Sequence, residues 1–292
     1  MFWQPINNLS NFYNQITTNI AGAERIFEVL DTEPEIQEEN GAKELPPING
    51  NVKFENATFA YDSDSENVLE NVNFEIKAGE TIALVGATGA GKSTIINLIS
   101  RFYDTNSGRV LIDGYDIKKV TIESLRQQMG IMTQENFIFS GTISENIKYG
   151  KLDATDQEVV EAAKAVNAHN FIMKLKNGYN TLLSEGGGGL SAGQKQLIAL
   201  ARTMISKPKI LILDEATSSI DTKTELLVQK GIEEILKGRT SFVIAHRLST
   251  IKKADRIFVI GNRNIIEEGT HKQLLEKKGV YYSLYRAQFD EV

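Results

Sequence analysis

The chain has no cysteine among its 292 residues. Disulfide bonds and thiolate-ligated metals are therefore excluded. The three histidines, His169, His246 and His271, stand far apart and do not have the spacing of metal ligands. Because oxidising compartments favour disulfides, this composition predicts a protein that works in contact with the cytosol.

Long hydrophobic runs and an excess of basic charge are also missing. The longest apolar runs, such as "ILIL" at 210–213, are far shorter than the roughly 20 residues of a membrane-spanning helix, and the start does not read as a secretory signal. We therefore expect that this chain alone spans no bilayer. The net charge is −6 and the chain has no long basic run, so the sequence shows no obvious basic surface for binding nucleic acid.

The hydrophobic residues that are present make up 41% of the chain, enough for one core with a small appended domain. Between residues 6 and 30 apolar residues recur at spacings of three and four, which predicts an amphipathic helix. Its apolar stripe packs either on its own domain or on another partner. The following acidic, proline-containing segment is a predicted linker, so we place an N-terminal helix and linker at 1–50 and the main domain at 51–292.

Strands and helices alternate through most of the main domain. Short apolar runs such as "TIALVG", "ILILDE", "SFVIA" and "RIFVI" are separated by helical stretches, which predicts an α/β fold with a parallel sheet. From about 135 to 195 helical patterns replace the strands, most clearly in "DQEVVEAAKAVNAHNFIMKL". We expect a helical insertion there.

A glycine-rich motif, "GATGAGKST" at 86–94, fits G-x-x-x-x-G-K-[ST] and stands between a predicted strand and a predicted helix. In that setting backbone N–H groups wrap phosphate oxygens at the positive end of a helix. Lys92 would reach the β- and γ-phosphates of ATP, and Ser93 would ligate Mg²⁺. A glycine-rich turn with an exposed lysine is the plainer alternative. The predicted nucleotide-binding residues are Gly86, Thr88, Gly89, Ala90, Gly91, Lys92, Ser93 and Thr94.

Polar residues end several predicted strands, at the edge where such sheets bind ligands. Asp214 would meet the metal, and Glu215 would orient and polarise an attacking water. His246 and Gln134 hold similar positions, and the Gln134 amide could contact Mg²⁺ or water, although a structural role is as common for both. Tyr61 is either a packed strand tyrosine or a ring that stacks on a base.

The stretch "SEGGGGLSAGQKQL" at 184–197 places four glycines before a helix-forming run. "LSAGQ", followed by "KQLIALARTMISKPKILILDEATSSID", resembles the nucleotide-binding domain of ATP-binding cassette (ABC) proteins, and the resemblance covers residues 51 to about 288. It implies a P-loop NTPase (RecA-like) parallel-sheet core with an antiparallel β subdomain and a helical signature subdomain. The implied activity is ATP hydrolysis.

The resemblance also assigns roles to residues. Tyr61 looks like the adenine-stacking aromatic, Gly86 to Thr94 the Walker A loop, Gln134 the Q-loop glutamine, and Asp214 the Walker B aspartate. Glu215 looks like the catalytic base, Asp221 the D-loop aspartate and His246 the switch histidine. The signature would be Leu190, Ser191, Ala192, Gly193 and Gln194, acting in trans on the ATP of a second copy of the domain, in a homo- or heterodimer.

Two further stretches resemble the exporter branch of the family. "FIFSGTISENIKYG" looks like the segment after the Q-loop, and "NNLSNFYNQITTNIAGAERIFEVLD" resembles the end of the last membrane helix with its link to the nucleotide domain. The resemblance implies an ATP-driven motor at the cytoplasmic face of the cell membrane, coupled to a transmembrane domain outside this chain. The alternative is a soluble ABC ATPase acting on nucleic acid or ribosomes. Such proteins usually carry two cassettes or a coiled-coil insertion.

The sequence departs from the family pattern at two places. In the signature, Ala192 stands at a position where glycine is the commonest residue in the family. Because both residues are small, this change leaves Ser191 and the Gly193 amide able to bind phosphate. In "TLLSEGG", Leu182 and Gly186 replace a glutamate and an arginine that exporters usually have. This second departure concerns contacts that couple domains rather than ATP chemistry.

Overall fold

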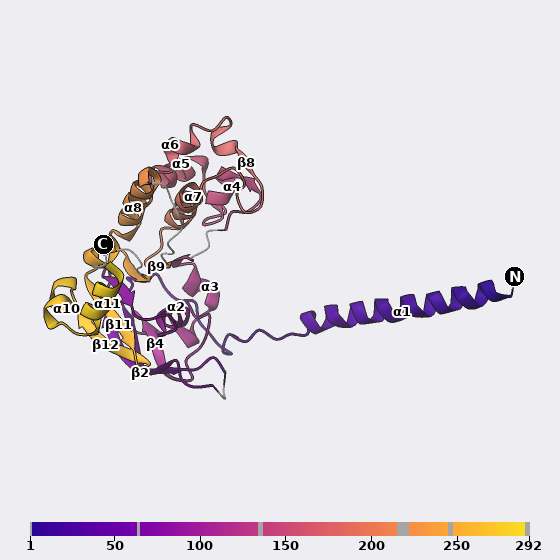
Figure 1. The fold of residues 1–292 in the computed structure, drawn as a ribbon, viewed down its shortest axis with the longest axis horizontal. Helices are drawn as coiled ribbons and strands as arrows, with labels where there is room; N and C mark the ends of the chain where they lie inside the picture. The colour runs from indigo at the N-terminus through magenta and orange to yellow at the C-terminus, as the bar shows by residue number, and fades with distance from the viewer. Residues whose placement is uncertain (1, 63–64, 134–136, 215–221, 245–247, 290–292) are drawn as a thin grey trace. The chain divides into compact units, whose positions relative to one another are not determined.

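The computed structural model describes residues 2–62, 65–133, 137–214, 222–244 and 248–289 (Figure 1). The chain divides into two compact units, Met1–Gln37 and Glu38–Val292. The second unit contains both of the sheets described below and all of the predicted site residues.

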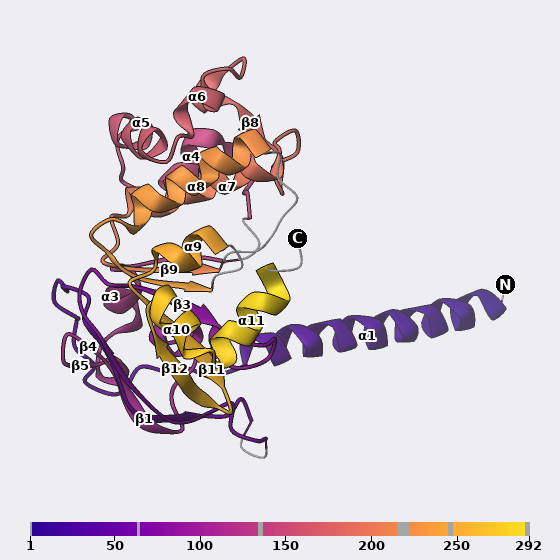
Figure 2. The ribbon, with the colours of Figure 1, turned by 60° about the vertical axis from the view of Figure 1, so that its left-hand side comes forward.

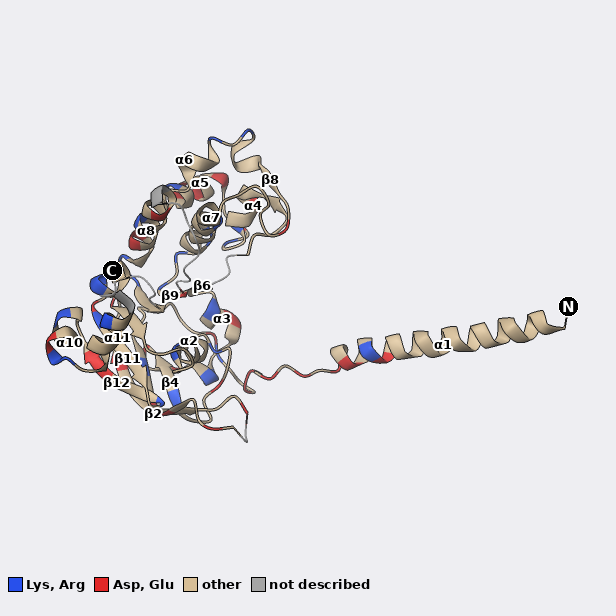
Figure 3. Ribbon diagram, viewed as in Figure 1, with Lys and Arg blue, Asp and Glu red and all other residues tan. Residues whose placement is uncertain are grey.

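The first unit contains one long helix, α1 (Trp3–Leu30). Pro5 lies in its first turn, where the missing N–H costs little, and Pro34 follows its end. Residues 3–23 carry no charged side chain, and the charges of the helix gather toward its C-terminal end (Figure 3). The predicted helix is confirmed, and its large apolar side chains, from Ile16 at 39% to Trp3 at 74%, are exposed. Among the residues described, no helix has the length and apolarity needed to cross a membrane.

A six-stranded sheet forms the centre of the second unit. Its strand order is β12 (Asn264–Gly269), β11 (Arg256–Gly261), β3 (Thr81–Val85), β10 (Thr240–Ile244), β9 (Ile210–Asp214) and β6 (Met129–Met132). The five strands from β11 to β6 are parallel, and β12 is antiparallel to β11. The predicted parallel sheet is confirmed, whereas the edge strand β12 was not predicted.

A second, antiparallel sheet has the strand order β2 (Leu69–Ile76), β1 (Val52–Phe59), β4 (Ser107–Ile112) and β5 (Tyr115–Asp116). Phe54 of β1 stacks on Phe74 of β2 with ring centroids 4.3 Å apart. Between the two sheets lie α2 (Lys92–Ile99) and the short α3 (Ile122–Arg126), with the 3-10 turn Ile117–Lys119 nearby (Figure 1). The expected antiparallel β subdomain is therefore present.

Two cores cover opposite faces of the parallel sheet because side chains alternate along each strand. In β9, Ile210 and Ile212 pack with α2 and the antiparallel sheet. Leu211 and Leu213 pack with the helices on the other side. The glycine-rich loop and its helix α2 therefore belong to one face of the sheet, and the helical region belongs to the other.

The helical region runs from β7 (Gly141–Thr142) to α7 (Ala192–Ile205) and packs beside α8 (Thr222–Leu236; Figure 2). The helical run predicted from "DQEVVEAAKAVNAHNFIMKL" is divided into α5 (Asp156–Ala165) and α6 (His169–Ile172), because Asn167 adopts a left-handed backbone with φ +64°. The two-residue strands β7 and β8 (Leu182–Leu183) pair antiparallel and so bring the two ends of this segment together. Its remaining elements are α4 (Ile143–Lys148), α5 (Asp156–Ala165), α6 (His169–Ile172), the 3-10 turn Gly178–Asn180 and β8 (Leu182–Leu183).

In the described part of the chain, four helices follow β9. These are α8 (Thr222–Leu236), α9 (Leu248–Lys253), α10 (His271–Lys277) and α11 (Val280–Phe289). Helix α8 joins the core on the helical side through Val228, Ile232 and Ile235, and α9 joins it through Ile251. The strands β9 and β10 are thus each followed by a helix that returns along the same face.

The segment before β1 packs against the rest of the second unit, to which it belongs. Leu45 and Ile48 are buried, and the Ile48 N–H donates to Gln128 Oε1 at 2.8 Å. The Asp113 carboxylate accepts hydrogen bonds from the N–H groups of Asn49 and Asn51, at 2.5 and 2.8 Å. The Asp113 carboxylate therefore fixes the position of the segment that leads into β1.

Candidate functional site

The glycine-rich loop connects the carboxyl end of β3 to the start of α2. Gly91 is the N-cap of α2 and has φ +104°, a conformation that favours glycine. A Cβ on Gly86 would lie 2.4 Å from the carbonyl oxygen of Ile260, so only glycine fits there. The loop thus brings its backbone close to a neighbouring strand and leads into the N-terminus of a helix, which attracts anions.

Lys92 lies back across this loop. Its ammonium donates hydrogen bonds to the carbonyl oxygens of Gly86 and Ala87, both at 2.8 Å. Burial lowers the pKa of Lys92, and the negative charge of Asp214 opposes that shift. The shift indicates a partly dehydrated ammonium within electrostatic reach of Asp214, and such an ammonium is suited to an anionic ligand.

Tyr61 stands beside the loop. Its hydroxyl is hydrogen-bonded to the Thr94 hydroxyl at 3.0 Å, and Thr94 is buried. The ring packs edge-on against Phe59 and Tyr103, with centroids 4.9 and 5.1 Å away. Tyr61 remains 40% exposed. Three contacts therefore fix the orientation of a ring that still has surface free for stacking.

Oxygen donors suited to a hard cation come from two elements. Asp214 ends β9, and Ser93 is exposed in the first turn of α2. Carboxylate and hydroxyl oxygens of this kind suit Mg²⁺. Gln134, Glu215, Asp221 and His246 lie outside the described residues, so their roles remain predictions from the sequence.

The signature stretch forms the N-terminus of the 14-residue helix α7. Ser191 is its N-cap: the Gln194 N–H donates to the Ser191 hydroxyl at 3.3 Å, and the Ser191 N–H donates to Gln194 Oε1 at 3.0 Å. Ser191 and Ala192 are exposed, and the first turn holds no acidic residue. This helix end is open to solvent and carries the partial positive charge of the helix dipole.

Of the preceding glycines, Gly187 is buried and a Cβ there would meet Ile138 at 3.1 Å. Gly186 and Gly189 have φ +73° and +87° with open space around them. The glycine run therefore forms a turn in which Gly187 packs against Ile138, whereas Gly186 and Gly189 are exposed.

Arg202, on the same helix, was not singled out in the sequence. Its guanidinium donates to the carbonyl oxygens of Asn146 and Phe137, both at 2.9 Å, and to Asn146 Oδ1 at 3.0 Å. It also lies over the rings of Phe139 and Tyr149. Arg202 thus ties α7 to the segment after Gln134. An arginine among apolar residues in "LIALARTMI" is the only sequence signal that pointed to it.

The structure brings Tyr61, Lys92, Thr94 and Asp214 into one neighbourhood, and it separates the signature from them. Helix α2 packs on one face of the parallel sheet, whereas α7 packs on the other. The phosphate loop and Ser191 therefore come from helices on opposite faces of the sheet.

Comparisons with known proteins identify sequences similar to this chain. The sequence matches the ABC transporter family over residues 69–218. Over 290 residues it is 50% identical to an uncharacterized ABC transporter ATP-binding protein of Bacillus subtilis, covering 99% of this chain and 48% of that protein. Over 291 residues it is 48% identical to an ATP-dependent lipid A-core flippase of Syntrophus aciditrophicus, covering 100% of this chain and 48% of that protein.

A solved structure is similar to this chain as well. The structure of a bacterial Atm1-family ABC exporter with ATP bound aligns with a TM-score of 0.84 at 40% identity, covering 98% of this chain and 50% of that chain. The chain therefore spans about half the length of the curated relatives it matches.

Proposed function

The chain belongs to the ABC transporter family, whose ATP-binding domains are ATPases, and we propose that it is the ATP-driven motor of a membrane exporter. The similarity to proteins named as a flippase and an exporter supports this assignment. Because those proteins are about twice as long, the remaining half of the transporter would be a membrane domain.

ATP would bind along the loop between β3 and α2. The loop amides and the Lys92 ammonium would hold the phosphates, and the exposed part of the Tyr61 ring would stack on the adenine. Ser93 and Asp214 supply the hard oxygen donors that Mg²⁺ requires, and Gln134 would complete the set. When bound, Mg²⁺ neutralises charge that develops on the phosphates. Glu215 would orient and polarise the attacking water, and His246 would assist from the end of the neighbouring strand.

The signature would act on a second copy of the domain. A two-fold dimer lets each copy offer the same patch to the other, so the exposed N-terminus of α7 in one copy can cover the phosphate loop of its partner. Asp221 would lie along the same interface. The observation that carries this proposal is the position of Ser191 at an open helix end, on a helix that packs on the opposite face of the sheet from α2.

The N-terminal unit would belong to the junction with the membrane domain. The exposed apolar stripe of α1 supports packing against other helices of a transmembrane bundle. We propose that residues 1–50 form this junction, that 51–292 form the nucleotide-binding domain, and that the motor works at the cytoplasmic face of the membrane.

Complementation between two inactive variants tests the composite site. Ser191→Arg should keep ATP binding but lose hydrolysis, and Lys92→Ala should lose tight ATP binding. A mixture of the two should regain partial activity, because one site of the mixed dimer combines an intact phosphate loop with an intact signature. Ser184→Arg, an exposed position in the same glycine-rich stretch, is the matched control. A mixture that hydrolyses no ATP would contradict the arrangement.

A further inference from the structure

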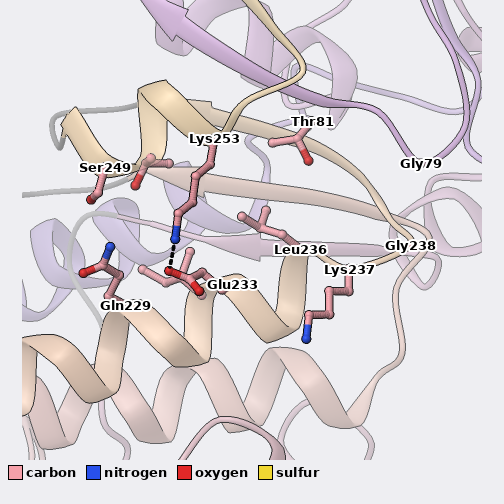
Figure 4. A pocket seen from close by; sticks show the side chains of 11 residues that line it. Gly79, Thr81, Gln229, Glu233, Leu236, Lys237, Gly238, Ser249 and Lys253 are labelled. Atoms are coloured by element: carbon pink, nitrogen blue, oxygen red, sulfur yellow. Dashed lines mark hydrogen bonds and ion pairs between the residues drawn. The ribbon is translucent and has the colours of Figure 1, made fainter.

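A cavity of about 340 Å³ lies between α8, α9 and the start of β3 (Figure 4). Each lysine in its lining is paired with a glutamate, Lys253 with Glu233 at 2.5 Å and Lys237 with Glu234 at 2.6 Å. These charges cancel, so the lining does not select the charge of a ligand. The α2–β4 loop (residues 100–106) differs from this cavity, because it contacts the proposed ATP site directly.

The α2–β4 loop is anchored by buried and charge-assisted contacts. The Arg101 side chain is fully buried, and its guanidinium donates a hydrogen bond to the carbonyl oxygen of Val120 at 2.8 Å. The Lys118 ammonium donates to the carbonyl oxygen of Thr105 at 2.6 Å. Charge-assisted hydrogen bonds of this kind are stronger than neutral ones, so the loop is a firm support for the residues that pack on it.

Asn106 of this loop holds the backbone that carries Tyr61. Its Oδ1 accepts a hydrogen bond from the N–H of Ala60 at 2.7 Å, and Ala60 directly precedes Tyr61. The N–H of Asn106 in turn donates to the carbonyl oxygen of Thr58 at 2.9 Å. These two hydrogen bonds fix the chain between the end of β1 and Tyr61.

Tyr103 of the same loop holds the Tyr61 ring itself. The two rings meet at 89° with centroids 5.1 Å apart, and Tyr103 also packs on Phe59 with centroids 5.5 Å apart. Phe59 contacts Tyr61 as well, so the three rings contact one another in pairs. Tyr103 is partly buried against the core that contains α2. Because edge-to-face contacts are favourable, they oppose rotation of the Tyr61 ring, which still has exposed surface for a ligand.

We propose that Tyr103 and Asn106 are positioning residues for the adenine of ATP, which act through Tyr61 rather than by touching the nucleotide. This role rests on the proposed function, in which Tyr61 stacks on the base. A ring that is already ordered loses less conformational entropy when the base binds, so part of the ATP affinity depends on the α2–β4 loop. Since this loop follows directly on α2, the helix that begins at the phosphate loop, one continuous segment supports both the phosphates and the base.

ATP affinity separates this role from a merely structural one. If Tyr103 and Asn106 only stabilised the fold, their loss would lower the free energy of unfolding, but the protein that remained folded would bind ATP normally. If they position Tyr61, the ATP affinity of the folded protein falls, and the loss disappears when the Tyr61 ring is absent. Single and combined variants therefore distinguish the two roles.

Isothermal titration of the full chain with the non-hydrolysable β,γ-imido analogue of ATP, in the presence of Mg²⁺, measures this affinity. Tyr61→Ala should bind the analogue roughly five- to 150-fold more weakly than wild type, the range expected for a lost stacking contact. Tyr103→Ala and Asn106→Ala should each weaken binding by about two- to tenfold, and by less than Tyr61→Ala. Thermal unfolding of the same samples verifies that each variant is folded at the temperature of the titration.

Conservative variants keep the contacts on which the proposal depends. Tyr103→Phe retains the ring, and Asn106→Asp retains an oxygen that accepts the Ala60 N–H, so both should bind the analogue within about twofold of wild type. Ser107→Ala, at the exposed residue that follows the loop, is the matched control for Asn106→Ala and should leave the affinity unchanged.

Double variants give the sharpest comparison. In the Tyr61→Ala background, Tyr103→Ala and Asn106→Ala should cause no further loss of affinity, because residues that act through Tyr61 cannot act once its ring is removed. The proposal is overturned if folded Tyr103→Ala and Asn106→Ala bind the analogue as wild type does, or if their losses multiply with that of Tyr61→Ala. Those results would leave the proposed function intact, whereas wild-type affinity in Tyr61→Ala would overturn the stacking role itself and this proposal with it.

Discussion

The hydroxyl of Tyr61 is hydrogen-bonded at 3.0 Å to that of Thr94, which is the last residue of the phosphate-loop motif. The ring proposed to stack on the base is therefore tied directly to the element proposed to hold the phosphates. Tyr103 and Phe59 each make a T-shaped contact with the same ring. These contacts therefore join the proposed site for the base to the proposed site for the phosphates within one chain.

Substitutions at Tyr61 separate stacking from this hydrogen bond. Tyr61→Ala should weaken ATP binding by about 1–3 kcal/mol, because the stacked ring is lost. Tyr61→Phe keeps the ring and loses only the hydrogen bond to Thr94, so ATP binding should weaken by no more than about 0.5–1.5 kcal/mol. Titration with ATP measures both. Tyr115→Ala, at a 47% exposed tyrosine of β5, should bind ATP normally. Equal affinities for Tyr61→Ala and wild type would contradict the stacking role.

Lys92→Ala should abolish tight binding of ATP with Mg²⁺. The ammonium is partly buried, and its carbonyl partners lie within the loop itself, so phosphate oxygens are better partners for its charge. Fluorescent ATP analogue titration measures the change. Lys174→Ala, at an exposed position of the helical region, should retain normal affinity. Unchanged affinity in Lys92→Ala would contradict the phosphate-loop assignment.

Arg202→Ala should destabilise the domain by about 2–4 kcal/mol, because three charge-assisted hydrogen bonds are lost and a buried Asn146 loses a partner. Arg202→Lys should recover part of this loss, since one ammonium cannot replace a guanidinium fork. Denaturant unfolding monitored by circular dichroism gives both values. If Arg202→Ala were as stable as wild type, Arg202 would not be the link between α7 and the segment after Gln134.

Asp113 predicts a dependence of stability on acid pH. Burial raises the pKa of Asp113, but hydrogen bonds from Asn49, Asn51 and Gly50 outweigh it and lower the pKa below its ordinary value of 3.8. A depressed folded-state pKa gives stability that is present above the unfolded pKa and is lost as pH falls through the folded pKa. The stability difference between wild type and Asp113→Asn should therefore be constant from pH 5 to 7 and shrink below about pH 4. Urea unfolding at each pH tests this, and a difference that does not change with pH would contradict it.

The sequence predicted those parts of the fold that depend on local patterns. Strand β9 was recognised because "ILIL" is a short buried run, and the phosphate loop because its glycines and Lys92 stand between a strand and a helix. The signature was found through a resemblance rather than through periodicity. The edge strand β12 was missed because its alternation is weak and because only two residues, Asn262 and Arg263, separate it from β11.

Contacts between distant segments were beyond sequence reasoning. The bond from Tyr61 to Thr94 joins residues 33 positions apart, and Arg202 reaches residues 56 and 65 positions away. The break at Asn167 rests on its left-handed backbone, with φ +64°. The contacts of Tyr61 and Arg202 have no local signature, because they join segments that only the fold brings together.

The central claim, that two copies close on ATP and open after hydrolysis, is tested most directly at Glu215. Glu215→Gln keeps size and hydrogen bonding but removes the carboxylate that would polarise the attacking water, so hydrolysis should fall by roughly 100-fold or more. With ATP no longer consumed, the closed dimer should accumulate, whereas wild type should remain mostly monomeric during turnover. Size-exclusion chromatography in ATP and Mg²⁺ should show the variant, but not wild type, at twice the mass of one chain. A variant that stays monomeric and hydrolyses ATP at the wild-type rate would contradict the account.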